Sequence, residues 1–213
     1  MGTPPLRLAV LLSGSGTTLQ NLIDHVEAGT LDARIVVVLA SRPDAYGLAR
    51  ATQHGLEAIC VPRLAYRDAG AYHRALHAAL DRYAPELIVL AGYLHLFRLA
   101  PRYRGRVMNI HPALLPAFGG RGCYGLRVHE AVLAHGVKLT GCTVHFADEA
   151  YDQGPIILQR AVPVLEDDTP QSLARRVFAE ECQAYPAAIR LFAQGRLRIE
   201  GRRVRILDPH DIA

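Results

Sequence analysis

Short apolar runs alternate with helical patterns through the first half of the chain, and this alternation constrains the fold more than any other feature. Strands are expected near residues 7–13, 35–40, 57–61 and 86–91, and helices near residues 17–28, 44–54 and 69–83. Strands and helices in regular succession indicate parallel strands joined by crossover helices. The run at 36–39 is entirely apolar, which is typical of a strand covered on both faces. We therefore expect an α/β fold: a Rossmann-like, doubly wound, mostly parallel sheet with helices on both faces.

The pattern changes after about residue 105 and predicts an antiparallel addition at the C-terminal end. We expect a strand at 106–110, a helix at 127–135, strands near 139–147 and 157–164, a closing helix from Thr169 to Gly195, and a hairpin from Arg196 to Leu207. Thr169-Pro170 is a helix-start signal, and Glu200-Gly201 is a turn signal. A chain of 213 residues is expected to form a single domain over 1–213, made of halves at 7–105 and 106–195 and a hairpin and tail at 196–213.

Charge and cysteine usage exclude several classes of protein. The four cysteines stand far apart without a C-x-x-C pair, so neither a zinc knuckle nor a disulfide framework is indicated. The apolar run Leu8–Leu12 is far too short to span a bilayer. The net charge of +4 is spread out except for the arginines between Arg196 and Arg205, which fit a solvated hairpin or a weak site for anions or nucleic acid. We expect a cytoplasmic protein that binds neither membranes nor nucleic acid.

The first strand ends in a glycine-rich turn, Ser13-Gly14-Ser15-Gly16-Thr17-Thr18-Leu19, that leads directly into a helix. Free backbone N–H groups at a helix start favour a bound phosphate, although such a turn also arises from packing alone. The turn lacks the Gly-Lys-Ser/Thr ending of a Walker loop. An NADP-dependent dehydrogenase is a weaker alternative, because Leu19 occupies the position of the third glycine in the dinucleotide fingerprint.

Asn109 and His111 stand at the C-terminal end of a predicted strand, where open α/β sheets bind their ligands. Residues two apart on a strand point to the same side, so an amide donor and a titratable donor are aimed at one point. Such a pair can polarise a carbonyl group and stabilise its developing oxyanion. A structural histidine remains the alternative on these residues alone.

In this context Asn-Ile-His-Pro-Ala-Leu-Leu-Pro, residues 109–116, closely resembles the catalytic segment of the glycinamide ribonucleotide formyltransferases. The resemblance runs from about residue 7 to 195. It includes, in order, Ser13-Gly14-x-Gly16-x-x-Leu19-Gln20, Leu90-Ala91-Gly92-Tyr93, Thr143-Val144-His145-Phe146 and Asp152-x-Gly154-Pro155-Ile156-Ile157-x-Gln159. It implies an enzyme that moves a formyl group from 10-formyltetrahydrofolate to the amine of glycinamide ribonucleotide in purine biosynthesis. It also implies that the bond between Leu115 and Pro116 is cis.

The resemblance assigns catalysis to Asn109, His111 and Asp152. Asn109 and His111 would bind the formyl oxygen while the amine attacks, and Asp152 would hold His111 and favour its charged form. A carboxylate and an imidazole with a trapped water can exchange the protons without a covalent intermediate. The half at 7–105 would then bind the nucleotide phosphate, and the half at 106–195 would carry catalysis and bind folate.

The resemblance also implies the binding residues for both substrates. For the nucleotide these are Gly16, Thr17, Thr18 and Glu181. For the folate they are Arg67, Leu94, His95, Leu96, Phe97, Asn109, His145, Asp148 and Glu149. Two departures matter. Ala69 stands where well-known bacterial members have the Arg beside the folate's glutamate tail, so Arg67 is at best a displaced substitute, and His95 likewise stands where those members have Arg. The glycine-rich stretch 117–126 is longer than usual and is either a mobile lid or a permissive surface loop.

Three other enzyme families and one non-enzyme class are alternative interpretations of the sequence. Methionyl-tRNA formyltransferases and formyltetrahydrofolate deformylases share the fold, but each carries a further domain that we do not expect here, and sugar-nucleotide formyltransferases rest on fold analogy alone. A folate- or nucleotide-binding module without chemistry is the non-enzyme alternative, and intact Asn109, His111 and Asp152 argue against it.

His73 and His77 have metal-ligand spacing on a helix but no third ligand, so we interpret them as a solvated face and expect no metal. We expect small-molecule substrates only and a monomer or homodimer.

Overall fold

The computed structural model describes residues 4–211, and the chain divides between Met108 and Asn109 into two compact units. The N-terminal unit contains β1 (Leu6–Leu12), α1 (Thr17–Glu27), β2 (Ala33–Ala40), α2 (Tyr46–Gln53), β3 (Ala58–Cys60), η1 (Arg63–Ala65), α3 (Ala69–Asp81), β4 (Leu87–Leu90) and η2 (Pro101–Tyr103). β5 (Val107–His111) begins in this unit and ends in the next. The division falls close to the expected boundary between the two halves at residues 105 and 106.

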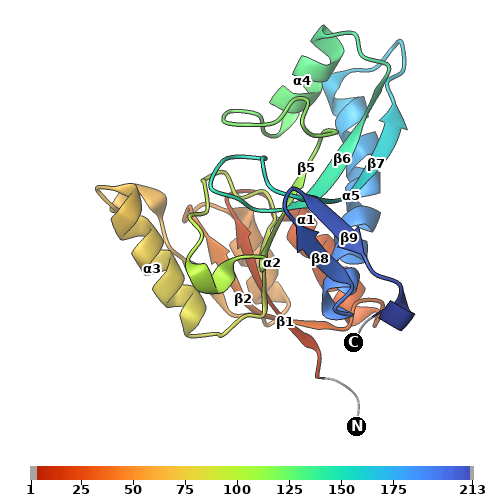
Figure 1. The fold of residues 1–213 in the computed structure, drawn as a ribbon. Coiled ribbons are helices and arrows are strands. Elements are labelled where there is room, and N and C mark those ends of the chain that lie inside the picture. The colour runs from red at the N-terminus through yellow and green to blue at the C-terminus, as the bar shows by residue number, and fades with distance from the viewer. Residues whose placement is uncertain (1–3, 212–213) are drawn as a thin grey trace. The chain divides into compact units, whose positions relative to one another are not determined.

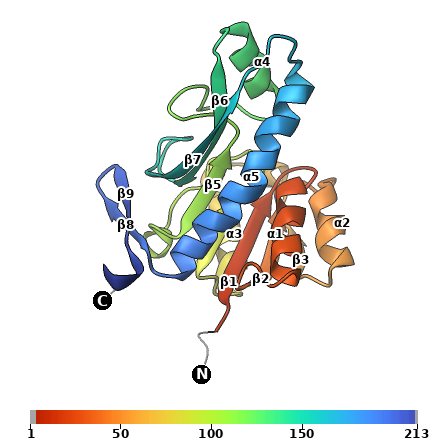
Figure 2. The same ribbon diagram turned by 90° about the vertical axis from the view of Figure 1, so that its right-hand side faces the viewer.

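The N-terminal unit is built on parallel strands in the order β3-β2-β1-β4. Helices α1 and α2 lie on one face of these strands and α3 lies on the other (Figures 1 and 2). Leu8, Val10 and Leu12 in β1 have no exposed surface, and neither do Ala9 and Leu11 between them. Both faces of β1 are therefore core, as the uninterrupted apolar runs predict.

The C-terminal unit contains α4 (Leu126–Ala134), β6 (Leu139–Phe146), β7 (Ile156–Pro163), α5 (Pro170–Ala193), β8 (Leu197–Glu200), β9 (Arg203–Ile206) and η3 (Pro209–Asp211). β6 pairs antiparallel with β7, and β8 pairs antiparallel with β9. α5 packs along β6 and β7 (Figure 2). The expected α/β class, mostly parallel with antiparallel strands in the C-terminal part, is confirmed.

Local signals in the sequence explain where these elements start and turn. Thr169 caps α5 by accepting a hydrogen bond from the Ser172 N–H, and Pro170 occupies the first turn. Gly154 permits the turn before β7, because a Cβ there would lie 1.8 Å from the Phe146 carbonyl oxygen. The Leu115–Pro116 bond is cis, as expected. None of the helices within residues 4–211 combines the length and apolarity that a membrane crossing requires.

Candidate active site

β5 delivers two polar side chains to one face at its C-terminal end. Asn109 and His111 alternate with the buried Met108 and Ile110, so the amide and the imidazole share a face. His111 is only 3% exposed, and therefore any group that it binds is largely removed from water. The strand alternation thus places a donor pair where the sequence predicts one.

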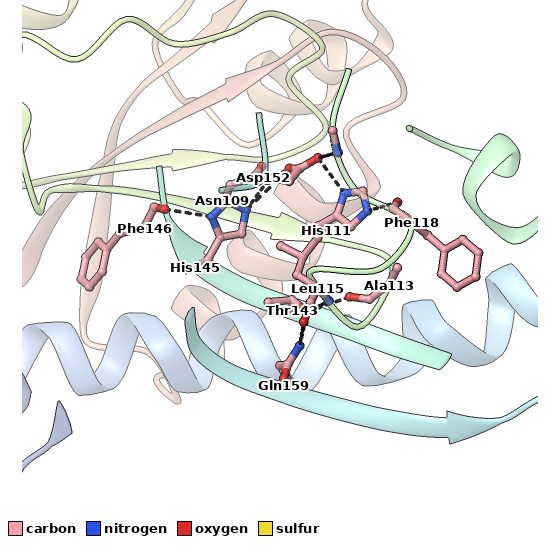
Figure 3. A network of polar contacts seen from close by, with 11 residues as sticks. Asn109, His111, Ala113, Leu115, Phe118, Thr143, His145, Phe146, Asp152 and Gln159 are labelled. Atoms are coloured by element: carbon pink, nitrogen blue, oxygen red, sulfur yellow. Dashed lines mark hydrogen bonds and ion pairs between the residues drawn. The ribbon is translucent and has the colours of Figure 1, made fainter. Parts of the chain in front are cut away.

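Asp152 comes from the loop between β6 and β7 and completes this group (Figure 3). Its Oδ2 accepts a hydrogen bond of 2.8 Å from the Gly120 N–H and lies 3.5 Å from Nδ1 of His111. Its Oδ1 accepts one of 3.3 Å from Nδ2 of Asn109. Asp152 has a positive φ of 55°, a conformation that Asp tolerates better than most residues. The structure therefore brings together Asn109, His111 and Asp152 although 43 positions separate the first from the last.

His145 belongs to the same network. Its Nδ1 donates a hydrogen bond of 2.8 Å to the Phe146 carbonyl, which leaves Nε2 to accept one of 3.1 Å from Nδ2 of Asn109. Nε2 also lies 3.7 Å from Oδ1 of Asp152. The sequence interpretation grouped His145 with the folate contacts, whereas its side chain lies beside the Asn109 amide and the Asp152 carboxylate.

The Nε2 atom of His111 donates a hydrogen bond of 2.9 Å to the Phe118 carbonyl, since a carbonyl can only accept. Burial lowers the pKa of His111, and the nearby Asp152 charge and Phe118 carbonyl offset this only in part. Burial pushes the pKa of Asp152 upward, but the imidazoles of His145 and His111 and the Gly120 N–H bring it below its ordinary value. Asp152 does favour charge on His111, as expected, yet burial outweighs it. The pair at neutral pH is a carboxylate beside a neutral imidazole.

The glycine-rich stretch 117–126 touches this network through its backbone. Phe118, with a φ of 53°, supplies the carbonyl for His111, and Gly120 supplies the N–H for Asp152. A Cβ on Gly119 would meet Leu115 at 2.5 Å and the Asp152 Cβ at 3.2 Å, so the loop passes closely over the carboxylate. Sequence reasoning missed both contacts, because main-chain groups carry no residue-type signal.

The turn expected to hold a phosphate lies in the N-terminal unit. Gly16 is the N-cap of α1, with a left-handed φ of 71° and no side-chain cap. Its missing side chain is required there, because a Cβ would lie 2.6 Å from the Gly47 Cα. Within residues 4–211, no protein group accepts a hydrogen bond from the N–H of Thr17 or Thr18.

Glu181 lies on α5 in the C-terminal unit and is partly buried. Burial raises the pKa of its carboxyl to about 7. None of the described residues forms a hydrogen bond or an ion pair with this carboxyl. A shielded acid without a protein partner is suited to a ligand that supplies donors.

The stretch expected to contact folate runs from Leu94 to Phe97 in the N-terminal unit. The Leu94 side chain is 39% exposed, whereas Phe97 is 2% exposed and belongs to the core. The Leu94 N–H already donates to Oγ of Ser13 at 3.0 Å. Burial, followed by the charge of Arg63, lowers the pKa of His95. The side chain at 95 is therefore a neutral ring at pH 7.

The remaining expected folate residues are dispersed. Arg67 is exposed beside Asp68, the N-cap of α3. Asp148 and Glu149 lie on the loop between β6 and β7, where the Asp148 carboxylate accepts a hydrogen bond of 2.7 Å from the Glu149 N–H. Among the described residues, no hydrogen bond or ion pair joins the side chains of Asp148 and Glu149 to the network around Asp152.

The interpretation of His73 and His77 as a solvated face was wrong. His73 is 7% exposed, and its ring nitrogens contact the carbonyls of Ala69 and Leu96 at 2.5 and 2.7 Å. His77 contacts the Arg98 carbonyl at 2.9 Å and packs against Phe97. Residues 4–211 contain no group of three or more His, Cys, Asp or Glu side chains arranged to hold a metal ion.

Comparison with known proteins places this chain in a wider family. The formyl transferase family matches residues 6–189. The phosphoribosylglycinamide formyltransferase of Escherichia coli is 37% identical over 196 residues, covering 91% of this chain and 90% of that protein. The chloroplastic phosphoribosylglycinamide formyltransferase of Vigna unguiculata is 37% identical over 193 residues, and there the match spans 90% of this chain but only 62% of that protein's length.

Solved structures of similar proteins support the same family. Glycinamide ribonucleotide transformylase 1 from Symbiobacterium toebii superposes with a TM-score of 0.89 at 50% identity, covering 97% of this chain and 96% of that one. A formyltetrahydrofolate deformylase from Burkholderia mallei superposes with a TM-score of 0.82 at 27% identity, where the match covers 96% of this chain and 70% of that one. With most of its length matched, the chain belongs to the formyl transferase family.

Proposed function

We propose that this chain transfers the formyl group of 10-formyltetrahydrofolate to the amine of glycinamide ribonucleotide, yielding formylglycinamide ribonucleotide and tetrahydrofolate in purine biosynthesis. The observation that carries the proposal is that the side chains of Asn109, His111 and Asp152 lie together, largely shielded from water, in a chain of the formyl transferase family. Relatives named phosphoribosylglycinamide formyltransferase match nearly the whole chain, which favours this acceptor.

Asn109 and His111 supply the two donors for the formyl oxygen. In the structure both are already satisfied by protein: Nδ2 of Asn109 donates to Asp152 and His145, and Nε2 of His111 donates to Phe118. The formyl oxygen therefore binds by exchange, replacing the Phe118 carbonyl at His111 and the longer of the two amide contacts. Negative charge that develops on this oxygen as the amine attacks is stabilised by donors that are already oriented.

Asp152 and His111 manage the protons. The attacking amine must lose one proton, and the folate nitrogen must gain one as its bond to the formyl carbon breaks. A carboxylate that is ionised at neutral pH accepts the first proton, directly or through a water, and the pair returns it to the leaving nitrogen. The net change is one N–H exchanged for another, so no oxidant, metal or covalent enzyme intermediate is required.

The substrate contacts belong to the same proposal. The phosphate would bind the N–H groups of Gly16, Thr17 and Thr18 at the start of α1, and Glu181 would accept hydrogen bonds from the nucleotide. For the folate we propose the backbone of 94–97, the loop residues Asp148 and Glu149, and Arg67 near its tail. Support for the folate residues is the resemblance rather than a contact.

We further propose that the protein works in the cytoplasm on small molecules alone, without metal or nucleic acid, as a monomer or homodimer. Each of these points rests on the family and on composition. The oligomeric state is tested by gel filtration, and independence of metal by activity in the presence of a chelator.

The test is incubation of the purified protein with 10-formyltetrahydrofolate and glycinamide ribonucleotide, following both the loss of formylated folate and the formylated nucleotide. Omitting the nucleotide is the decisive control, because a deformylase of this fold uses water as acceptor. Equal folate turnover with and without the nucleotide would contradict transfer. Nucleotide-dependent turnover with one formylated product per folate consumed supports it.

A further inference from the structure

A second buried network lies next to the catalytic side chains and is centred on Thr143 in β6 (Figure 3). The Thr143 hydroxyl donates a hydrogen bond of 2.7 Å to the Ala113 carbonyl. It accepts one of 3.0 Å from the Leu115 N–H and one of 2.9 Å from Nε2 of Gln159. A hydroxyl has one donor and two acceptor positions, so this one is fully used.

Gln159 completes the attachment from β7. It stands directly opposite Thr143 in the antiparallel pair, and its Nε2 also donates a hydrogen bond of 3.0 Å to the Leu115 carbonyl. Both polar groups of Leu115 and the carbonyl of Ala113 are therefore held by two side chains that face each other across a strand pair. Thr143 is fully buried, which makes these bonds costly to break.

The backbone held in this way connects His111 to its own hydrogen-bond acceptor. Ala113 and Leu115 lie between His111 and Phe118, and the bond from Nε2 of His111 to the Phe118 carbonyl closes this segment on itself. Because its middle is attached to β6 and β7, the imidazole cannot shift far without straining those bonds, whereas the Phe118 carbonyl lies beyond the attached part and can give way to a substrate oxygen. Thr143 and His145 are two residues apart on β6. The same strand therefore supplies both the hydroxyl that holds this backbone and the imidazole that contacts Asn109.

We propose that Thr143 and Gln159 are positioning residues that fix the backbone at Ala113 and Leu115, so that His111 presents its Nε2–H to the carbonyl oxygen it must bind. At rest that oxygen belongs to Phe118, and during reaction it belongs to the formyl donor. The inference rests on the proposed function for its catalytic consequence. Neither residue touches a reacting atom.

The chain offers a matched set of variants. Thr143→Val keeps the shape but removes the hydroxyl, and Thr143→Ser keeps the hydroxyl. Gln159→Met removes the amide from an exposed residue, where misfolding is not expected. Thr140→Val is the control: Thr140 lies on the same strand, is 1% exposed, and its hydroxyl has no partner among the described residues.

We expect Thr143→Val and Gln159→Met to lower kcat by about 10-fold to 100-fold, the range for slight misplacement of a catalytic group, while KM changes by less than about threefold. Thr143→Ser should restore most of the rate, and Thr140→Val should leave it unchanged. The double variant Thr143→Val with Gln159→Met should be little worse than Thr143→Val alone, because both act through one segment. A wild-type rate in both single variants would overturn the inference.

Nitrogen-15 NMR of the His111 ring tests the same inference without an assay of activity. The wild-type spectrum should show hydrogen on Nε2, and Gln159→Met should weaken or abolish that preference, whereas Thr140→Val should not. An unchanged His111 spectrum in Gln159→Met overturns the positioning role, even if the wild-type protein catalyses the proposed reaction. If wild-type protein forms no formylated nucleotide, the proposed function fails, and the NMR comparison still decides the positioning role.

Discussion

Replacing Asp152 by Asn removes a charge from the proposed catalytic group while keeping its shape. The amide oxygen of Asn can still accept from the Gly120 N–H, which lies 2.8 Å from Oδ2 in the native protein. The side chain of Asp152 is about 10% exposed, so water replaces little of what the charge contributes. We expect a folded protein with an impaired proton exchange.

The distance between Asp152 and His111 sets the size of the effect on a protonated imidazole. Oδ2 of Asp152 lies 3.5 Å from Nδ1 of His111, and once the neutral ring takes up a proton, unit charges at that separation attract by about 5 kcal/mol at an effective dielectric constant of about 20. Loss of this attraction lowers the pKa of His111 further below its ordinary range and removes the proton acceptor. Since a positioned acid or base contributes about 10²- to 10⁴-fold, kcat should fall by that factor.

The assay compares nucleotide-dependent folate turnover in Asp152→Asn with that in Asp167→Asn, which alters an exposed carboxylate in the turn before α5. Circular dichroism and thermal melting should show both variants folded. Substrate affinity should change far less than kcat, because the charge acts on the chemical step. A rate for Asp152→Asn within threefold of the control would refute the assigned role.

Four further predictions follow from the same structure. Burial raises the pKa of the Glu181 carboxyl to about 7, above its value of 4.5 in the unfolded chain, so the free energy of unfolding falls as pH rises from the lower value to the higher. Glu181→Gln should therefore melt at a higher temperature than wild type at pH 8 but not at pH 4. The same variant should raise KM for the nucleotide at least tenfold. Burial lowers the pKa of His129, with the charge of His111 adding to it; stability present above the unfolded pKa is lost as pH falls below about 6.5, and His129→Gln should flatten the fall in Tm between pH 7 and 5. Gly16→Ala should raise KM for the phosphate-bearing acceptor more than about tenfold, whereas Gly29→Ala, whose φ is 68° with open space around it, should not. Charged initiator transfer RNA should not be formylated by the purified protein at a rate approaching that with glycinamide ribonucleotide.

The helices and strands were predictable because their apolar runs are long and their caps are explicit. β1, α1, β6 and α5 begin and end within about two residues of the expected positions. The same periodicity indicates that His73 is buried, because Tyr72, His73, Leu76 and Leu80 follow helical spacing and all four are buried. A histidine on that stripe is part of the core rather than of a solvated face.

The arrangement of the candidate catalytic group was predictable only in part, for a physical reason. Asn109 and His111 share a strand, so alternation alone places them together, but Asp152 reaches them through tertiary packing that only the family resemblance indicated. The contributions of Phe118 and Gly120 come from main-chain atoms in a loop with positive φ values. Residue identity does not reveal which carbonyl or N–H a loop will present.

The hydrogen bonds around the site differ in length according to what they hold. Those that anchor the supporting structure are short, such as the 2.7 Å bond from Thr143 to the Ala113 carbonyl and the 2.8 Å bond from Gly120 to Asp152. The contacts between the proposed catalytic side chains are longer: the hydrogen bond from Asn109 to Asp152 is 3.3 Å, and Nδ1 of His111 lies 3.5 Å from Oδ2 of Asp152. Longer contacts are weaker and tighten when a substrate completes the group. The exception is the 2.9 Å bond from His111 to the Phe118 carbonyl; under the proposed function, a formyl oxygen that binds Nε2 of His111 must replace this carbonyl, which belongs to the glycine-rich stretch.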